Sequence, residues 1–137
     1  MGQMYEISCT LCKASAGVME GRGMRHGNSF EDLYFNYMDQ DDRFSIGMNI
    51  PSGSRNKITK CFYSHQALAC VKCNAISSKL VWSIEFESGW KFIPPNKCNQ
   101  CHAEVKKLPF PDKGVFKQRC WECDSETLQV ELTAMWD

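Results

Sequence analysis

The apolar residues of this chain recur mostly with the two-residue period of a β-strand. The clearest case is KLVWSIEFE (79–87), whose alternate apolar side chains share one face: Leu80, Trp82, Ile84 and Phe86. The segment ETLQVELTAMW (126–136) repeats this alternation, and MYEISC (4–9) is predicted to form a further strand. Shorter strands are predicted at KITKCFY (57–63), EVKKL (104–108) and GVFKQRC (114–120). The chain is therefore expected to be rich in β-structure.

One segment, SFEDLYFNYMDQ (29–40), has the spacing of an amphipathic helix instead. Five of its side chains line one face: Phe30, Leu33, Tyr34, Tyr37 and Met38. Ser29 can cap the N-terminus of this helix, and the acidic residues of the first turn suit the helix dipole. The polar run DQDDR (39–43) is expected to end it. The flanking segments 17–29 and 48–57 are predicted to be turns or loops.

The chain contains nine cysteines, and eight of them form C-x-x-C pairs, a pattern typical of metal ligands. The pairs are Cys9/Cys12, Cys70/Cys73, Cys98/Cys101 and Cys120/Cys123, and Cys61 stands outside them. Two thiolates on a tight turn can share one ion at about 2.3 Å each, and a second pair completes a tetrahedron. The sequence therefore predicts two four-cysteine metal sites, most simply with two zinc ions per chain. Iron fits the same ligands.

The spacing favours one pairing of these turns. Cys98/Cys101 and Cys120/Cys123 would close a zinc-ribbon hairpin built from strands 104–108 and 114–120. Cys9/Cys12 would then pair with Cys70/Cys73 across a long insertion, which is tolerated because closure entropy grows slowly with loop length. The main alternative is an interleaved pairing. A third arrangement is a local site from Cys61, His65, Cys70 and Cys73, which would leave Cys9/Cys12 as a free dithiol.

The residue after each second cysteine is expected to have a positive φ angle. Glycine usually stands at such positions, but here they hold Lys13, Asn74, His102 and Asp124. Asn, Asp and His enter the left-handed region more readily than other non-glycine residues. Lys13 is the exception, so the first turn fits the pattern least. His102 is accordingly interpreted as a turn residue rather than as a metal ligand.

These elements predict a small metal-stabilised α+β fold: two zinc-ribbon-like β units with one inserted helix. The first unit would span 1–92 with its helix at about 29–40, and the second 96–137, joined by KFIPPNK (91–97). The two units could also share one core. Neither half has many apolar residues, so metal binding, worth of order 10 kcal/mol per structural site, should contribute to folding.

The stretch YEISCTLC (Tyr5–Cys12), the four C-x-x-C pairs and the terminal MWD resemble a group of small bacterial proteins of the zinc-ribbon superfamily. Members of this largely uncharacterised group open with a strand and a C-x-x-C turn, carry a helical insertion and finish with a second ribbon. The resemblance implies the fold and a metal. It implies no activity.

The composition of the chain indicates the cellular compartment in which it is expected. The chain has 137 residues and a mean hydropathy of −0.40, without an apolar run long enough to span a membrane. Its beginning does not resemble a signal peptide, so a cytoplasmic location is expected. The cytosol keeps thiols reduced, which again favours metal ligands over disulfides.

No catalytic constellation is apparent, because closed four-cysteine sites leave no open coordination position and nothing else indicates an active site. Cys61 and His65 are close enough in sequence to form a thiol–imidazole pair, but a buried cysteine beside a surface histidine is the favoured interpretation of them. The chain is therefore not expected to be an enzyme. A module that binds another protein, through the helix or the aromatic-rich strands, is the favoured function.

Two alternatives remain open. A basic stretch interleaved with Phe110, Phe116 and Trp121 is typical of nucleic-acid contacts. Its charged members are Lys106, Lys107, Lys113, Lys117 and Arg119. Against this, eight thiolates and two Zn²⁺ ions would take the formal charge from zero to about −4, which opposes attraction to phosphate. The second alternative is a redox or electron-transfer protein with a metal held by four cysteines.

Overall fold

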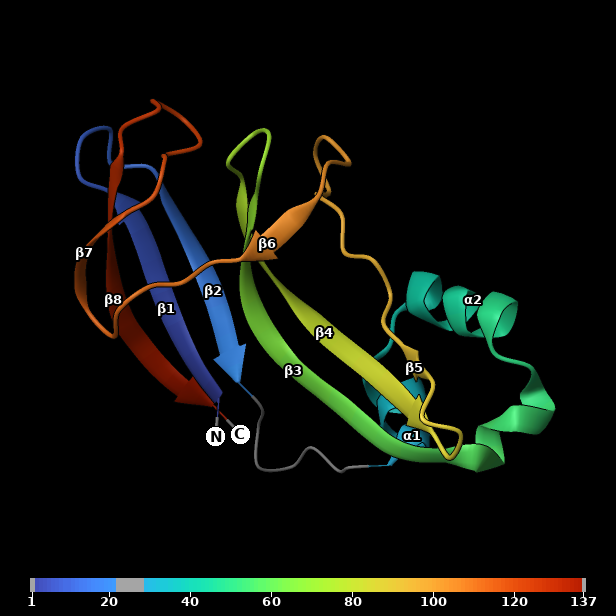
Figure 1. The fold of residues 1–137 in the computed structure, drawn as a ribbon. Coiled ribbons are helices and arrows are strands. Elements are labelled where there is room, and N and C mark those ends of the chain that lie inside the picture. The colour runs from blue at the N-terminus through green and yellow to red at the C-terminus, as the bar shows by residue number, and fades with distance from the viewer. Residues whose placement is uncertain (1, 22–28, 137) are drawn as a thin grey trace. The chain divides into compact units, whose positions relative to one another are not determined.

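The computed structural model describes residues 2–21 and 29–136, and antiparallel strands dominate this part of the chain (Figure 1). The strands are β1 (Gly2–Cys9), β2 (Ser15–Gly21), β3 (Ile58–Cys70), β4 (Ile76–Phe86), β5 (Lys91–Phe92), β6 (Val105–Lys107), β7 (Gly114–Lys117) and β8 (Thr127–Trp136). The helical segments are short: α1 (Phe30–Asp32), the π-helical η1 (Leu33–Tyr37), α2 (Gln40–Asn49) and the 3-10 turn η2 (Ser52–Lys57). The predicted α+β class is confirmed.

Strand pairing follows the order β5-β4-β3-β2-β1-β8-β7, and β6 pairs with β3. Strand β1 has a long partner on each side. It pairs with β2 from Gly2↔Gly21 to Ser8↔Ser15, and with β8 from Gly2↔Trp136 to Cys9↔Leu128. The first and last strands are therefore joined along their whole length.

The described residues form two compact units, which are considered separately. Unit 1 contains 2–21, 65–79 and 96–136, and unit 2 contains 29–64 and 80–95. This division replaces the predicted boundary between 1–92 and 96–137. The boundary was placed at a Pro-containing linker, whereas strands β3 and β4 each run through both units, so unit 2 is inserted in the chain of unit 1.

The core of unit 1 is built from alternate residues of its long strands. The core residues on β1 are Tyr5, Ile7 and Cys9, which alternate as expected for a strand with one face toward a core. They pack with buried residues of β2, β3 and β8, and of the segments that connect β6 to β8: Val18, Ala67, Ala69, Leu108, Cys120, Leu128 and Val130. Cysteines that begin two of the C-x-x-C turns are therefore part of this core.

The core of unit 2 contains the strongest alternation of the sequence. Trp82, Ile84 and Phe86 of β4 are buried as predicted, while Leu80 is partly buried. Tyr63 of β3 lies among them, and its hydroxyl donates a 2.9 Å hydrogen bond to the Asp32 carboxylate. The helical segments complete this core with Leu33, Met38, Ile46 and Ile50.

The helical prediction is correct at its start and wrong at its end. The Ser29 hydroxyl accepts a hydrogen bond from the Asp32 N–H at 3.1 Å, the cap that the sequence predicts. The segment expected to end the helix instead starts another, since the Asp39 side chain accepts from the Asp42 N–H at 2.8 Å and caps α2. Residues 17–21, predicted as loop, lie in β2, and the rest of that prediction, 22–28, lies outside the described residues.

Candidate metal centres

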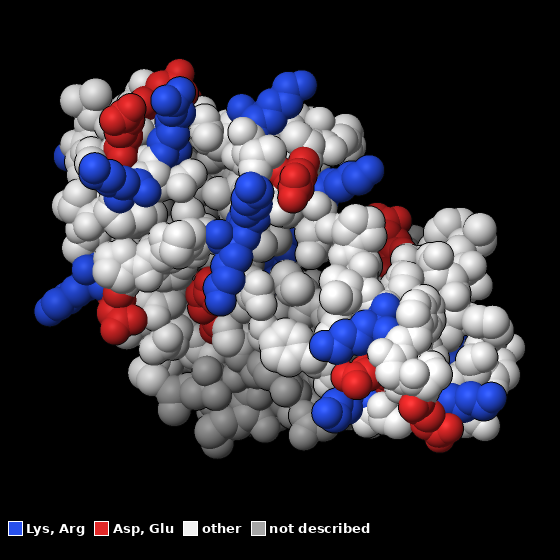
Figure 2. Space-filling view, viewed as in Figure 1, with Lys and Arg blue, Asp and Glu red and all other residues white. Residues whose placement is uncertain are grey.

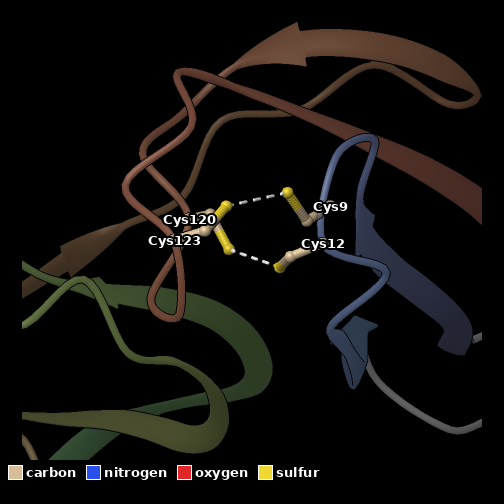
Figure 3. Close-up of side chains that lie close together, drawn as sticks. All are labelled: Cys9, Cys12, Cys120 and Cys123. Carbon is tan, nitrogen blue, oxygen red and sulfur yellow. Dashed lines mark hydrogen bonds between the residues drawn. The ribbon is translucent and has the colours of Figure 1, made fainter.

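The eight paired cysteines gather into two clusters, both in unit 1. The outer cluster contains Cys9, Cys12, Cys120 and Cys123, and the inner cluster contains Cys70, Cys73, Cys98 and Cys101. Within each cluster the four sulfur atoms lie within 4.8 Å of one another. Each cluster can therefore hold one metal ion. Figure 3 shows the four side chains of the outer cluster converging from two separate turns.

The observed pairing corrects the predicted one. The first C-x-x-C turn joins the last, and the second joins the third, so the clusters are nested rather than sequential or interleaved. The predicted hairpin of 104–108 with 114–120 does not form, because β6 pairs with β3 and β7 pairs with β8. Pairing between strands far apart in the sequence decides which turns meet, and the spacing of the cysteines does not predict that pairing.

The proposed local site with Cys61 and His65 is also excluded. Cys70 and Cys73 belong to the inner cluster. Cys61 and His65 lie four residues apart on one strand, which places them about 13 Å apart along its axis, too far for a thiol–imidazole pair. The imidazole packs edge-on against the Trp136 ring at 5.2 Å.

Each of the four turns contains the same type of backbone hydrogen bond. In each, the N–H of the first cysteine donates to the carbonyl five residues later, at 2.8–2.9 Å. The accepting residues are Ala14, Ala75, Ala103 and Ser125. This small residue two positions after the second cysteine is a repeated signal that the sequence interpretation missed: CTLCKA, CVKCNA, CNQCHA and CWECDS.

The conformational prediction for the turns is confirmed at all four positions. The φ angle is 66° at Lys13, 62° at Asn74, 61° at His102 and 60° at Asp124. Lys13 adopts the left-handed conformation despite its unfavourable side chain, so the first turn has the same geometry as the others. His102 is a turn residue and does not belong to either cluster.

The sulfur separations fit a tetrahedral ion. In the outer cluster Cys9 and Cys123 are 3.6 Å apart and Cys12 and Cys120 are 3.7 Å apart. In the inner cluster the corresponding distances are 3.4 Å and 3.6 Å. Four sulfurs at about 2.3 Å from a central ion would be about 3.8 Å from one another, so little movement is needed to bind one.

Backbone N–H groups prepare the first cysteine of a turn to be a thiolate. The N–H groups of Cys12 and Leu11 lower the pKa of Cys9 to about 6. Those of Cys73 and Lys72 act in the same way on Cys70, whose pKa is also about 6. In each cluster, therefore, at least one thiol loses its proton readily before a cation binds.

Two of the second cysteines in the turns, Cys73 and Cys123, have a pKa shifted in the opposite direction. At Cys73 and Cys123 a backbone hydrogen bond lowers the pKa, but burial and the neighbouring thiols outweigh it and raise the pKa to about 12. Four thiolates at these distances repel one another, and a divalent cation supplies the charge that lets all four lose their protons.

The basic residues predicted to contact nucleic acid do not share one hairpin. Lys106 and Lys107 lie on β6, which pairs with β3, while Lys117 lies on β7, which pairs with β8. Arg119 lies 4.0 Å from the Glu126 carboxylate. Lys113 precedes β7 and is exposed. The structure thus distributes this set over two separate strand pairs.

None of the helices in residues 2–21 and 29–136 is long and apolar enough to cross a membrane. No family model matches the chain, no curated protein matches it, and no solved structure matches it. The two four-cysteine clusters, with their zinc-ribbon-like turns, are therefore what the chain itself offers as a functional site.

Proposed function

We propose that this chain is a cytoplasmic zinc protein in which both ions are structural, and that it acts as a protein-interaction module. The metal assignment rests on the convergence of eight thiols into two groups with nearly tetrahedral sulfur separations. Zinc is the simplest occupant, because it takes four thiolates without geometric strain.

A structural role follows from the number of ligands. Four protein sulfurs saturate a tetrahedral ion, so no position is left for water or substrate. The ions would instead stabilise the turns that hold β1 to the segment before β8, and β3 to the segment before β6. For this reason we propose no enzymatic activity.

The interaction role is supported by apolar side chains that face solvent on unit 2. On α2, Phe44 and Met48 are one helical turn apart and are 70% and 71% exposed. Elsewhere on unit 2, the half-exposed Trp90 stacks on Phe86 with ring centroids 5.1 Å apart. These two rings border a groove of about 520 Å³ that Ile50 and Pro51 also line. Aromatic and methionine side chains are enriched in protein interfaces.

Nucleic-acid binding is the less favoured alternative. Figure 2 shows Lys and Arg side chains interspersed with Asp and Glu over the described part of the face in view. Eight thiolates and two Zn²⁺ ions would take the formal charge of the chain from zero to about −4, which opposes attraction to phosphate. Oligonucleotide binding that weakens with salt, and that is lost on charge reversal at Lys106, Lys107 and Lys113, would favour this alternative over the protein partner.

Elemental analysis of untagged protein together with native mass spectrometry tests the metal assignment. Two zinc ions per chain are expected, in a colourless protein. A red protein containing iron at the same ligands would favour the electron-transfer alternative. A chain purified without any metal under reducing conditions would refute the proposal.

The interaction role is tested with a double variant, Phe44→Ser with Met48→Ser. Cross-linking in cells is expected to capture a partner protein on the wild-type chain but not on this double variant. The partner should be retained by Val115→Ser, which changes an exposed apolar residue of unit 1 and serves as the matched control. If the same partner is captured equally by all three proteins, α2 is not the binding surface.

A further inference from the structure

We infer that the two metal sites differ in lability: the outer cluster holds an exchangeable ion, and the inner cluster a permanent one. Cys12 and Cys123 would be the thiolates through which a competing metal chelator or a soft electrophile reaches the outer ion. This inference rests on the proposed zinc binding and adds an exchange site to it.

The ligands of the two clusters differ in their exposure to solvent. In both clusters the first cysteine of each turn is buried: Cys9, Cys70, Cys98 and Cys120. The second cysteines differ between the clusters, because Cys12 and Cys123 are exposed while Cys73 and Cys101 are only partly exposed. Attack on a metal–thiolate bond needs access to the sulfur, and reactivity follows thiolate character and exposure. The outer cluster therefore presents two accessible sulfurs.

The two clusters also differ in the charges around them. An ion of charge +2 with four thiolates carries a net charge of about −2. The last turn of the outer cluster adds two exposed carboxylates, Glu122 and Asp124, against the single positive charge of Lys13 in its first turn. The turns of the inner cluster contain Lys72 and no carboxylate. Zinc binding displaces the protons of the thiols, so the loaded centre is more negative than the protonated empty cluster. Neighbouring carboxylates therefore disfavour the loaded state, and the outer ion is held less firmly.

The outer turns also stay in place when the ion leaves. The first turn connects β1 and β2, which pair over seven residues, and β1 also pairs with β8 as far as Cys9↔Leu128. The last turn is anchored to the same ladder by the pairing of β7 with β8 and by the Gln118 N–H to Glu126 carbonyl bond of 3.1 Å. These ladders do not involve the metal. An emptied outer cluster can therefore bind an ion again without refolding.

The inner cluster depends more on its ion. The turn of Cys98 and Cys101 is joined to β3 through β6, which pairs over three residues. Two flanking backbone bonds extend this short ladder, from the Val71 N–H to the Glu104 carbonyl at 3.1 Å and from the Leu108 N–H to the Ala67 carbonyl at 3.0 Å. Loss of the inner ion would remove much of what holds this turn, so the inner site acts as a permanent staple.

The test measures zinc release and thiol modification together on the fully loaded protein. N-ethylmaleimide is added with 4-(2-pyridylazo)resorcinol, whose absorbance reports released zinc. Peptide mass spectrometry locates the adducts when one zinc equivalent has been released. The maleimide double bond takes the thiolate sulfur on one carbon and a proton from water on the other. Adducts at Cys61, which lies outside both clusters, are counted separately.

We expect one zinc ion to leave about tenfold faster than the other or more, which corresponds to a barrier difference of about 1.4 kcal/mol. The adducts present at that stage should lie on Cys12 and Cys123. Equal release rates, or first modification of Cys73 or Cys101, would overturn the inference while leaving the proposed zinc binding intact. A chain that contains no zinc would overturn both.

A matched pair of variants isolates each site. Cys12→Ser removes an outer ligand and should leave one slowly released zinc ion, whereas Cys73→Ser removes an inner ligand and should leave one rapidly released ion. The opposite assignment of rates would contradict the inference. Should either variant fail to fold, the adduct positions in the wild-type protein still decide the question.

Discussion

Trp82→Ala should destabilise unit 2 strongly and leave the metal sites of unit 1 intact. Trp82 is 1% exposed in the core of unit 2, and its ring centroid lies 5.7 Å from that of Phe92. Burial raises the pKa of Asp42, and a hydrogen bond from the Trp82 side chain to this carboxyl group offsets only part of the rise. Replacing a buried tryptophan by alanine costs about 3–5 kcal/mol, through lost burial and the cavity that remains. This is a large part of the stability of a small unit.

Hydrogen–deuterium exchange measures the effect separately in each unit. Because every 1.4 kcal/mol changes an opening equilibrium about tenfold, the slowest amides of 29–64 and 80–95 should exchange about 10²- to 10⁴-fold faster. Those of unit 1 should be unchanged, and the protein should retain two zinc ions. Phe44→Ala, at an exposed position, is the control and should change exchange little.

The reasoning would be refuted if Trp82→Ala accelerated exchange equally in both units or released zinc. The two units would then unfold as one cooperative structure. A cost well below about 1 kcal/mol would instead mean that the core of unit 2 does not depend on this indole ring.

Three further changes test smaller parts of the structure. Lys13→Gly should raise the melting temperature. Glycine adopts the left-handed conformation without steric strain, and the free energy gained in this way exceeds the entropic cost of glycine in the unfolded chain by about 0.5–1 kcal/mol. A lower melting temperature would contradict this. Tyr63→Phe should lower the stability of unit 2 by about 1.5–3 kcal/mol, since the hydrogen bond to Asp32 involves a charged group. A double-mutant cycle in urea with Asp32→Ala should recover this coupling, and strict additivity would argue against it. Zinc affinity should fall as the pH is lowered, most steeply below about pH 6, where Cys9 and Cys70 bind protons that compete with the metal; competition titrations that show no dependence between about pH 8 and 5 would exclude thiolate ligation.

Local features of the metal turns could be predicted from the sequence because they depend on neighbouring residues. The C-x-x-C spacing identified the eight cysteines of the two clusters. The position after each second cysteine predicted the positive φ angles, and the residue type supported this at Asn74, His102 and Asp124 but not at Lys13. Likewise, alternation within one strand predicted the buried face of Trp82, Ile84 and Phe86.

The pairing of the turns could not be predicted in this way, because it depends on contacts between distant strands. The short separation between Cys101 and Cys120 favoured a hairpin, but β7 and β8 form the ladder that fixes the last turn. The ladder between β1 and β8 then brings Cys9 to it. The end of the predicted helix failed for a local reason, since Asp39 was interpreted as part of a polar terminator when it caps the next helix.

The nested pairing of the turns has a consequence for synthesis of the chain. A ribosome releases the N-terminal turn first, but the partner of that turn is the last of the four to emerge. The inner cluster can close as soon as Cys101 is free, while Cys9 and Cys12 must wait for Cys120 and Cys123. Zinc would therefore be acquired in a fixed order, inner before outer. Closure of the outer cluster would mark a chain that has been translated through its last turn.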